Sequence, residues 1–346
     1  MTKEWAVIIP LPVYLVILPY GFDMQKFTLW FLGLLCCGLM SPLPWAYAAE
    51  WELQLDGQYH LSGSPVSVTV DPLHGGRITD FRLLKKGDNI LLPATVEPET
   101  YGSTFWLSPQ STWDWPPDAT IDRLPYTAIV TGDTLTLESG VSPSLGIQVS
   151  KHIRPDRSGI RLDYEIHPVS QVNSTSPLVY APWEVSRVAG SGLTLFPLGS
   201  GISNIQGFEP PPILQSQGIA IWDHQSDQIS TFTEARDQKL FADGTGGWLA
   251  HVDSGLLFVK QFPDLPPEVI APGESEIEVY ATASRRYLEL EVQGPYNFLA
   301  ETPQTWSVQW QLRSLPPSLA PRPNNPQFLE WIRQVVQDSP EKNYSL

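Results

Sequence analysis

Short runs in which apolar and polar residues alternate dominate the chain between residues 49 and 315, and no stretch there shows sustained helical periodicity. Such alternation places apolar side chains on one face of an extended strand and polar side chains on the other. Turn-forming sequences such as Thr131-Gly132-Asp133 and Ala271-Pro272-Gly273 separate the runs. Many short strands predict an all-β sandwich, larger than an immunoglobulin domain because about 260 residues carry the pattern. The clearest runs are 66–70, 134–138, 159–164 and 307–312.

The acidic composition argues against two classes of partner. The formal net charge is −16, whereas proteins bind nucleic acids and anionic membrane surfaces through basic patches. We therefore expect no nucleic-acid partner and no docking to an anionic membrane. The 34 prolines occur without low-complexity runs, which suits loops and strand ends better than long helices.

The first 48 residues have the pattern of an export segment. Lys26 gives a short basic start after Met24, residues 27–40 are apolar, and Ala46-Tyr47-Ala48 is the small-x-small pattern of a signal-peptidase site. We expect translation to start at Met24, cleavage after Ala48, and a periplasmic or extracellular product with no stable membrane anchor. The alternative is an uncleaved anchor, but the apolar run is shorter than the ~20 residues of a membrane span.

Several kinds of chemistry are excluded because their motifs are missing. The chain has no Gly-x-Ser-x-Gly sequence, no phosphate-binding loop and no dinucleotide fingerprint. Its six histidines never fall at metal-ligand spacing, and both cysteines, Cys36 and Cys37, lie in the export segment. We therefore expect no zinc site, no cofactor and no disulfide in the mature domain. The sequence leaves a calcium site open, because the carboxylates and carbonyls that bind calcium leave little local signature.

One helix is expected, after a β domain at 49–316 and within a C-terminal segment at 317–346. Asn325 can cap this helix, and Pro326 suits its first position. Pro340 would end it. The simplest interpretation is a helix packed on the sandwich, and the alternative is a helix that binds a partner protein. The apolar face would consist of Phe328, Leu329, Ile332, Val335 and Val336.

A loop at 101–117 carries three tryptophans, Trp106, Trp113 and Trp115, among serine, threonine, glutamine and aspartate residues. The flat C–H faces of sugar rings lie against aromatic rings, and sugar hydroxyls need polar partners. The loop therefore predicts a carbohydrate surface. The alternative is that the indoles plug one end of the sandwich.

Two strands carry candidate acids or bases. In the segment 180–188, Glu184 and Ser186 share one face, while Trp183 and Arg187 lie on the other. A buried Glu184 would have a raised pKa and could serve as an acid or base. The alternative is a structural glutamate–arginine pair.

The second strand, at 287–293, alternates three polar residues with leucine and valine. Glu289 and Glu291 would stand ~7 Å apart, close enough to line one cleft. A solvent-facing strand edge is the alternative interpretation, above all for Glu289. Lys239 and Lys260 are further candidates because lysine is scarce in this chain.

Together with Gly75-Gly76-Arg77-Ile78, these segments resemble the galactose mutarotase-like superfamily and, within it, the DUF4380 domain, over residues of about 52 to 316. The resemblance implies a β-supersandwich whose concave face holds a sugar. It also implies a carboxylate base in a Glu-x-Gln strand, matched by Glu291-Val292-Gln293, with Glu289 as a competing assignment. The family's catalytic histidines are not matched, because Trp183-Glu184 stands in their place.

Three functions are compatible with these patterns. In the first, an exported protein binds carbohydrate without demonstrated catalysis. In the second, an aldose 1-epimerase-like enzyme uses Glu291 as base and Glu184 or His251 as acid. In the third, an envelope interaction protein has kept the fold without a sugar site. The predicted sugar-binding residues are Trp106, Trp113 and Trp115 for stacking, and Arg77, Glu184, Arg187, Lys239, Glu289 and Glu291 for hydroxyl groups.

Overall fold

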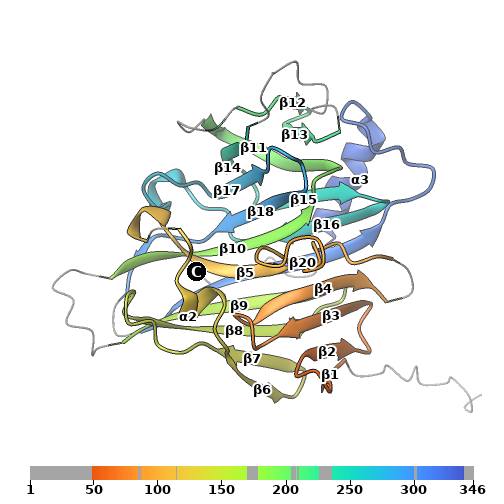
Figure 1. Ribbon diagram of the computed structural model, residues 1–346. Helices are drawn as coiled ribbons and strands as arrows, with labels where there is room; N and C mark the ends of the chain where they lie inside the picture. Colours follow the sequence, from red (N-terminus) through yellow and green to blue (C-terminus); the bar gives the residue numbers. More distant parts are fainter. Residues whose placement is uncertain are drawn as a thin grey trace, which may run out of the picture. The chain divides into compact units, whose positions relative to one another are not determined.

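The alternating sequence runs form antiparallel strands in the computed structural model (Figure 1), which describes residues 49–338 except 85–86, 114, 170–177, 204–207, 209, 226–235 and 300–301. The predicted runs at 66–70, 134–138, 159–164 and 307–312 all lie within strands, as β3, β7, β9 and β20. The predicted export segment at 1–48 and Pro340 lie outside the described residues.

The first sheet contains the strands that carry most of the candidate residues. Its strands pair in the order β1, β2, β3, β4, β5, β10, β18, β17, β14 and the second half of β11. The bounds are β1 (Glu50–Leu53), β2 (Tyr59–Ser62), β3 (Val66–Asp71), β4 (Arg77–Leu83), β5 (Ser103–Ser108), β10 (Val179–Ala189), β11 (Leu193–Ser203), β14 (Gln238–Gly244), β17 (Ile277–Ala281) and β18 (Tyr287–Gln293).

The second sheet pairs in the order β6, β7, β8, β9, β20, β16, β15, the first half of β11, β13 and β12. Strand β11 therefore belongs to both sheets. The short β19 (Asn297–Phe298) pairs with the start of β10. The other bounds are β6 (Thr127–Thr131), β7 (Thr134–Glu138), β8 (Ile147–Pro155), β9 (Gly159–Pro168), β12 (Ile213–Ser216), β13 (Ile219–Asp223), β15 (Trp248–Asp253), β16 (Leu256–Gln261) and β20 (Gln304–Ser314).

The core lies between the two sheets. Phe81 of β4 meets Trp310 of β20 edge to face, with ring centroids 5.3 Å apart, and Phe258 of β16 contacts both rings. All three side chains are fully buried. Such edge-to-face contacts stabilise the fold beyond what the burial of apolar surface contributes. The all-β sandwich predicted from the alternation is confirmed.

The predicted C-terminal helix is α3 (Pro326–Gln337), and the Asn325 side chain accepts a hydrogen bond from the Gln327 amide at its start. Its apolar face packs on strands of the second sheet through Phe328, Leu329, Ile332 and Val336, which are all buried. The packed-helix interpretation therefore holds, and this face is not free for a partner.

A second, four-residue helix, α2 (Ala119–Asp122), was not predicted. It is too short for a periodic pattern, and its main sequence signal is Asp118, whose carboxylate accepts hydrogen bonds from the amides of Thr120 and Ile121. Such capping stabilises a helix start. The helix matters because it presents Asp122 to the first sheet.

Candidate functional site

Strand alternation divides the residues of β10 between the two faces of the first sheet. Glu184 points into the core, where it contacts Lys260 and Trp310 of the second sheet. Trp183 and Arg187 lie on the opposite face, hereafter the outer face. Strand β18 pairs with β10 in a register that sets Glu291 opposite Val185 and Glu289 opposite Arg187. Both carboxylates of β18 therefore share the outer face with Trp183.

A cluster of indoles covers one end of the outer face. Trp106 of β5 stands opposite Trp183 in the strand register, and their ring centroids are 5.4 Å apart at an angle of 86°. Trp115 meets Trp106 edge to face at 5.8 Å and is 63% exposed. Trp113 packs against both Trp106 and Trp183. Edge-to-face packing fixes the orientation of each ring, so the cluster is a preformed aromatic wall.

Asp122 of α2 anchors the central indole. Its Oδ1 accepts hydrogen bonds from Trp106 Nε1 at 2.8 Å and from Thr104 Oγ1 at 2.9 Å. Arg77 donates to the Asp122 carbonyl at 3.3 Å and lies 3.5 Å from Oδ1. Because Trp106 is only 5% exposed, this bond satisfies a buried indole N–H. The position of Trp106 therefore depends on α2.

A polar row crosses four strands beside the indoles. Lys239 of β14 stands opposite Tyr280 of β17, which stands opposite Glu289 of β18, which in turn stands opposite Arg187 of β10. The Nε atom of Arg187 donates to Glu289 Oε1 at 2.9 Å, and its guanidinium lies 5.1 Å from the Trp106 ring centroid. Cross-strand neighbours of this kind interact directly, so the row connects the lysine to the aromatic wall.

A second, deeper group joins Lys239 to two buried carboxyls. Lys239 Nζ lies 2.7 Å from Glu278 Oε2 and 3.3 Å from Glu291 Oε2, and Gln293 donates to Glu278 Oε1 at 2.7 Å. Burial raises the pKa of Glu291 to about 7, and the ammonium of Lys239 limits this rise. Burial also raises the pKa of Glu278. With two carboxyls around one cation in a dry site, Glu291 can hold or release a proton near neutral pH.

These groups surround a cavity of about 370 Å³, hereafter the outer-face cavity. Sugar-sized ligands are bound in cavities that combine apolar walls with a few polar groups. Here the aromatic rings offer flat surfaces, and the carboxylates and the ammonium offer hydrogen-bond partners. The lining side chains are the aromatic Trp106, Trp115, Trp183, Phe208, Phe241, Tyr280 and Tyr287, and the polar Gln110, Asp237, Lys239, Glu274 and Glu289.

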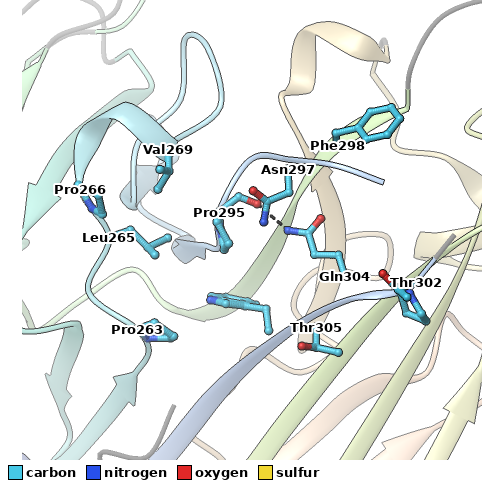
Figure 2. A pocket seen from close by; sticks show the side chains of 12 residues that line it. Pro263, Leu265, Pro266, Val269, Pro295, Asn297, Phe298, Thr302, Gln304 and Thr305 are labelled. Atoms are coloured by element: carbon cyan, nitrogen blue, oxygen red, sulfur yellow. Dashed lines mark hydrogen bonds between the residues drawn. The ribbon is translucent and has the colours of Figure 1, made fainter. Parts of the chain in front are cut away.

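A larger cavity, of about 770 Å³, lies elsewhere and is mostly apolar (Figure 2). Pro295 and Gln304 face each other there, and Gln304 Nε2 donates to the Pro295 carbonyl at 2.6 Å. None of the described residues that line it is ionisable. The outer-face cavity is the better candidate because it alone of the two combines aromatic faces with charged groups.

The structure brings four of the predicted site residues together. Trp106, Trp115, Lys239 and Glu289 line the outer-face cavity. Arg187 and Glu291 lie directly beneath it, through their contacts with Glu289 and Lys239. The two candidates for the carboxylate base in β18 therefore occupy different positions. Glu289 lies on the cavity wall, and Glu291 lies beneath Lys239.

Three predicted residues do not reach the cavity. Trp113 packs behind Trp106, and its Nε1 donates to the Leu107 carbonyl at 2.7 Å. Arg77 is buried against Asp122 and Tyr101. Glu184 lies on the core side of the sheet, bonded to Ser103, Ser186, Trp310 and Lys260. Glu184 and Glu291 were expected to converge, but they lie on opposite faces because residues of opposite strand parity point apart.

His251, the other acid considered, lies in the second sheet and also fails to reach the cavity. It is fully buried, and Thr194 Oγ1 lies 3.1 Å from His251 Nδ1 and 2.9 Å from His224 Nε2. Burial lowers the pKa of His251 to about 4 and lowers that of His224 as well. Both imidazoles are therefore neutral parts of the core at neutral pH.

This histidine pair should make the fold sensitive to acid. In the unfolded chain a histidine becomes protonated as the pH falls below 6.5, whereas in the folded protein His251 stays neutral down to about pH 4. Lower pH therefore favours the unfolded state. We expect His251 alone to lower the free energy of unfolding by about 2 kcal/mol between pH 7.5 and 5. Urea denaturation of the wild type and of His251→Asn at both pH values measures this. Equal pH dependence in the two proteins would contradict it.

Several cavity residues were missed by sequence reasoning. Trp183 and Tyr287 lie in the two strands that were selected for their glutamates, and Asp237 lies two residues before the candidate Lys239. Continuing the period-two alternation back from Arg187 identifies Trp183. Tyr280 carries no comparable signal, because only the pairing of β17 with β14 and β18 brings it to the cavity. Glu274, in the segment before β17, carries none either.

In the described part of the chain, no group of three or more histidine, cysteine, aspartate or glutamate side chains could hold a metal ion. Among the same residues, none of the helices has the length and hydropathy of a membrane span.

The chain is similar to one sequence family and to solved structures. The family model described as "Domain of unknown function (DUF4380)" matches residues 57–313. A galactose mutarotase-like protein from Lactobacillus casei ATCC 334 matches with a TM-score of 0.53 and 9% identity, over 74% of this chain and 100% of that chain. One from Clostridium acetobutylicum matches with a TM-score of 0.50 and 9% identity, over 77% and 98%. A search of curated proteins finds no match. The expected β-supersandwich is confirmed.

Proposed function

Because this chain belongs to the DUF4380 family and has the fold of galactose mutarotase-like proteins, we propose that it is an exported carbohydrate-binding protein. The sugar would occupy the outer-face cavity. The observation that carries the proposal is that Trp106, Trp115, Lys239 and Glu289, which lie far apart in the sequence, line one cavity of about 370 Å³.

The chemistry of the cavity supports a sugar in particular. Trp115 presents an exposed indole on which the C–H face of a pyranose can stack. Asp237, Glu274 and Glu289 can accept hydrogen bonds from sugar hydroxyls, and Gln110 and Lys239 can donate to them. The rings are held in place by one another and by Asp122, so binding would cost little ordering of side chains.

Trp115 provides the most direct test. We expect Trp115→Ala to weaken sugar binding about tenfold or more, because a stacked indole contributes over 1 kcal/mol. Because the ring is largely exposed, the free energy of unfolding should change by less than about 0.5 kcal/mol. A glycan array identifies a ligand, and calorimetry with that ligand compares wild type and variant.

Trp113→Ala is the matched control. Its indole is half-buried behind Trp106 and hydrogen-bonded to a carbonyl, so truncation leaves a cavity and should cost about 2 kcal/mol of stability. The proposal predicts opposite profiles, with affinity lost in Trp115→Ala and stability lost in Trp113→Ala. If Trp115→Ala binds sugar as the wild type does, the outer-face cavity is not the sugar site.

The pKa of Glu291, raised by burial to about 7, favours acid–base catalysis as a second candidate function. In an aldose 1-epimerase-like reaction Glu291 would take the proton of the anomeric hydroxyl, and Lys239 is the nearest group that could donate one. Lys239 would have to move aside first, because it lies between Glu291 and the cavity. Anomeric exchange measured by NMR tests this candidate, and Glu291→Gln should abolish any acceleration.

Export is supported by the sequence of residues 1–48 alone, as described above. Sequencing the N-terminus of the protein recovered outside the cytoplasm tests it. We expect that N-terminus to be Ala49, and a product that still begins at or before Met24 would contradict cleavage.

A further inference from the structure

We infer that the outer-face cavity selects a positively charged ligand, namely a sugar that carries a protonated amino group. This inference rests on the proposed function, because it assumes that the cavity holds a sugar. It adds the class of sugar, which follows from the balance of charge, the hydrogen-bond partners of two carboxylates and the aromatic walls.

Carboxyl groups outnumber cations around the cavity. The described residues that line it or lie directly beneath it include two cations, Lys239 and Arg187. Both are already paired, since Arg187 bonds Glu289 at 2.9 Å and Lys239 lies between Glu278 and Glu291. Among the described residues that line the cavity or lie beneath it, no unpaired cation therefore remains for the other two lining carboxylates.

Those carboxylates are Asp237 and Glu274, and the described groups that donate hydrogen bonds to them are neutral. Asp237 accepts hydrogen bonds from the Tyr280 hydroxyl and the Ala283 amide, both at 2.7 Å. Glu274 Oε1 accepts a hydrogen bond from the backbone N–H of Gln110 at 2.7 Å. Within the described residues neither carboxylate forms an ion pair. Hydrogen bonds from these donors hold the two carboxylates in place, where they can accept hydrogen bonds from a cation.

The aromatic walls favour the same ligand. Seven of the lining side chains are aromatic, and the negative face of an aromatic ring attracts an ammonium group. The protein already uses this contact, since Lys239 Nζ lies 5.2 Å from the Trp183 ring centroid. Within the described residues no cation lies over the exposed Trp115. An amino sugar could stack there and direct its ammonium toward the free carboxylates.

The charge of the whole chain acts in the same direction. A net charge of −16 attracts cations and repels anions over distances comparable with the Debye length. A uronic acid would have to place its carboxylate near Asp237 and Glu274, which disfavours it. A neutral hexose would fit by hydrogen bonding alone, so the net charge of the sugar is what the cavity can discriminate.

Calorimetry on the full chain tests the inference with methyl glycosides of glucosamine and galactosamine, their neutral parent hexoses and their N-acetylated forms. At slightly acidic pH and low salt, we expect one amino sugar to bind about tenfold more tightly than its parent hexose. N-acetylation should remove the gain because it removes the charge. High salt should reduce the gain because it screens the carboxylates. These comparisons of ligands and salt concentrations use the wild-type protein alone.

The double variant Asp237→Asn/Glu274→Gln identifies the groups responsible. The amides keep the shape of the site but carry no charge, so the ratio of amino-sugar affinity to parent-hexose affinity should fall from about ten in the wild type to about one in the double variant. Equal binding of amino and neutral sugars by the wild type overturns this inference and leaves the proposed function standing. A preference that survives in the double variant also overturns it. Failure of every sugar to bind overturns both.

Discussion

Replacing Lys260 with methionine is expected to lower the free energy of unfolding by about 3–5 kcal/mol. The ammonium of Lys260 lies 2.9 Å from Glu184 Oε1 and donates to the Leu290 carbonyl at 2.6 Å, and both ionisable side chains are buried. Without it, Glu184 would remain in the core as an uncompensated charge. Urea denaturation near neutral pH measures the loss.

The double variant Lys260→Met/Glu184→Gln distinguishes the loss of the ion pair from the cost of leaving Glu184 charged and unpaired. The carbonyl oxygen of glutamine can still accept the hydrogen bond from Trp310, and its NH2 group can donate to the Ser186 hydroxyl. We therefore expect glutamine to recover about half of the loss. Arg154→Met is the matched control, because it breaks an ion pair with Asp163 at the surface and should cost less than about 1 kcal/mol. A loss in Lys260→Met no larger than in Arg154→Met would show that the buried pair contributes little.

The same double variant bears on function. Glu184 lies on the core side of the first sheet, away from the outer-face cavity. We therefore expect Lys260→Met/Glu184→Gln to bind sugar within about twofold of the wild type. A structural role for Glu184 predicts this combination of reduced stability and retained affinity, whereas a role as the acid in catalysis requires Glu184 to contact the ligand.

Gly75→Ala is expected to be similarly damaging, with a loss of at least about 3 kcal/mol. Gly75 has a φ of +75°, and a Cβ placed there would lie 1.9 Å from the carbonyl oxygen of Asp122. The atoms that this Cβ would meet are backbone atoms of Asp122 and Arg123. No flexible side chain can move aside to relieve the clash, so α2 must shift. Because Asp122 holds Trp106, the substitution should also weaken sugar binding.

Gly132→Ala controls for the backbone conformation alone. Gly132 has a φ of +62°, but no atom lies within 4 Å of a Cβ placed there. Its substitution should cost about 1–2 kcal/mol through strain and leave sugar affinity unchanged. Thermal or urea unfolding of both variants decides between the two contributions. Equal losses would show that contact with Asp122 is unimportant.

Much of the fold was predictable because its signals are local. Period-two alternation identified the strands that became β3, β7, β9 and β20, and a capping asparagine followed by proline located α3. These patterns depend on neighbouring residues only, since each strand must bury one face and each helix must satisfy its first amides. The four-residue α2 escaped because a single turn carries almost no periodicity.

For the candidate site, the sequence by itself determined residue types and strand parity. It grouped three indoles within ten residues and placed carboxylates in two strands, and it set Trp183 and Glu184 on opposite faces of β10. The prediction that all three indoles lie in a loop was wrong for Trp106, which is in β5 (Ser103–Ser108) and pairs with β10. Which of those faces is the core was decided by packing against the second sheet. The gathering of Lys239, Tyr280, Glu289 and Arg187 was decided by strand register. Register joins strands that are far apart in the chain, and the hydrophobic burial that sets it acts on the sandwich as a whole.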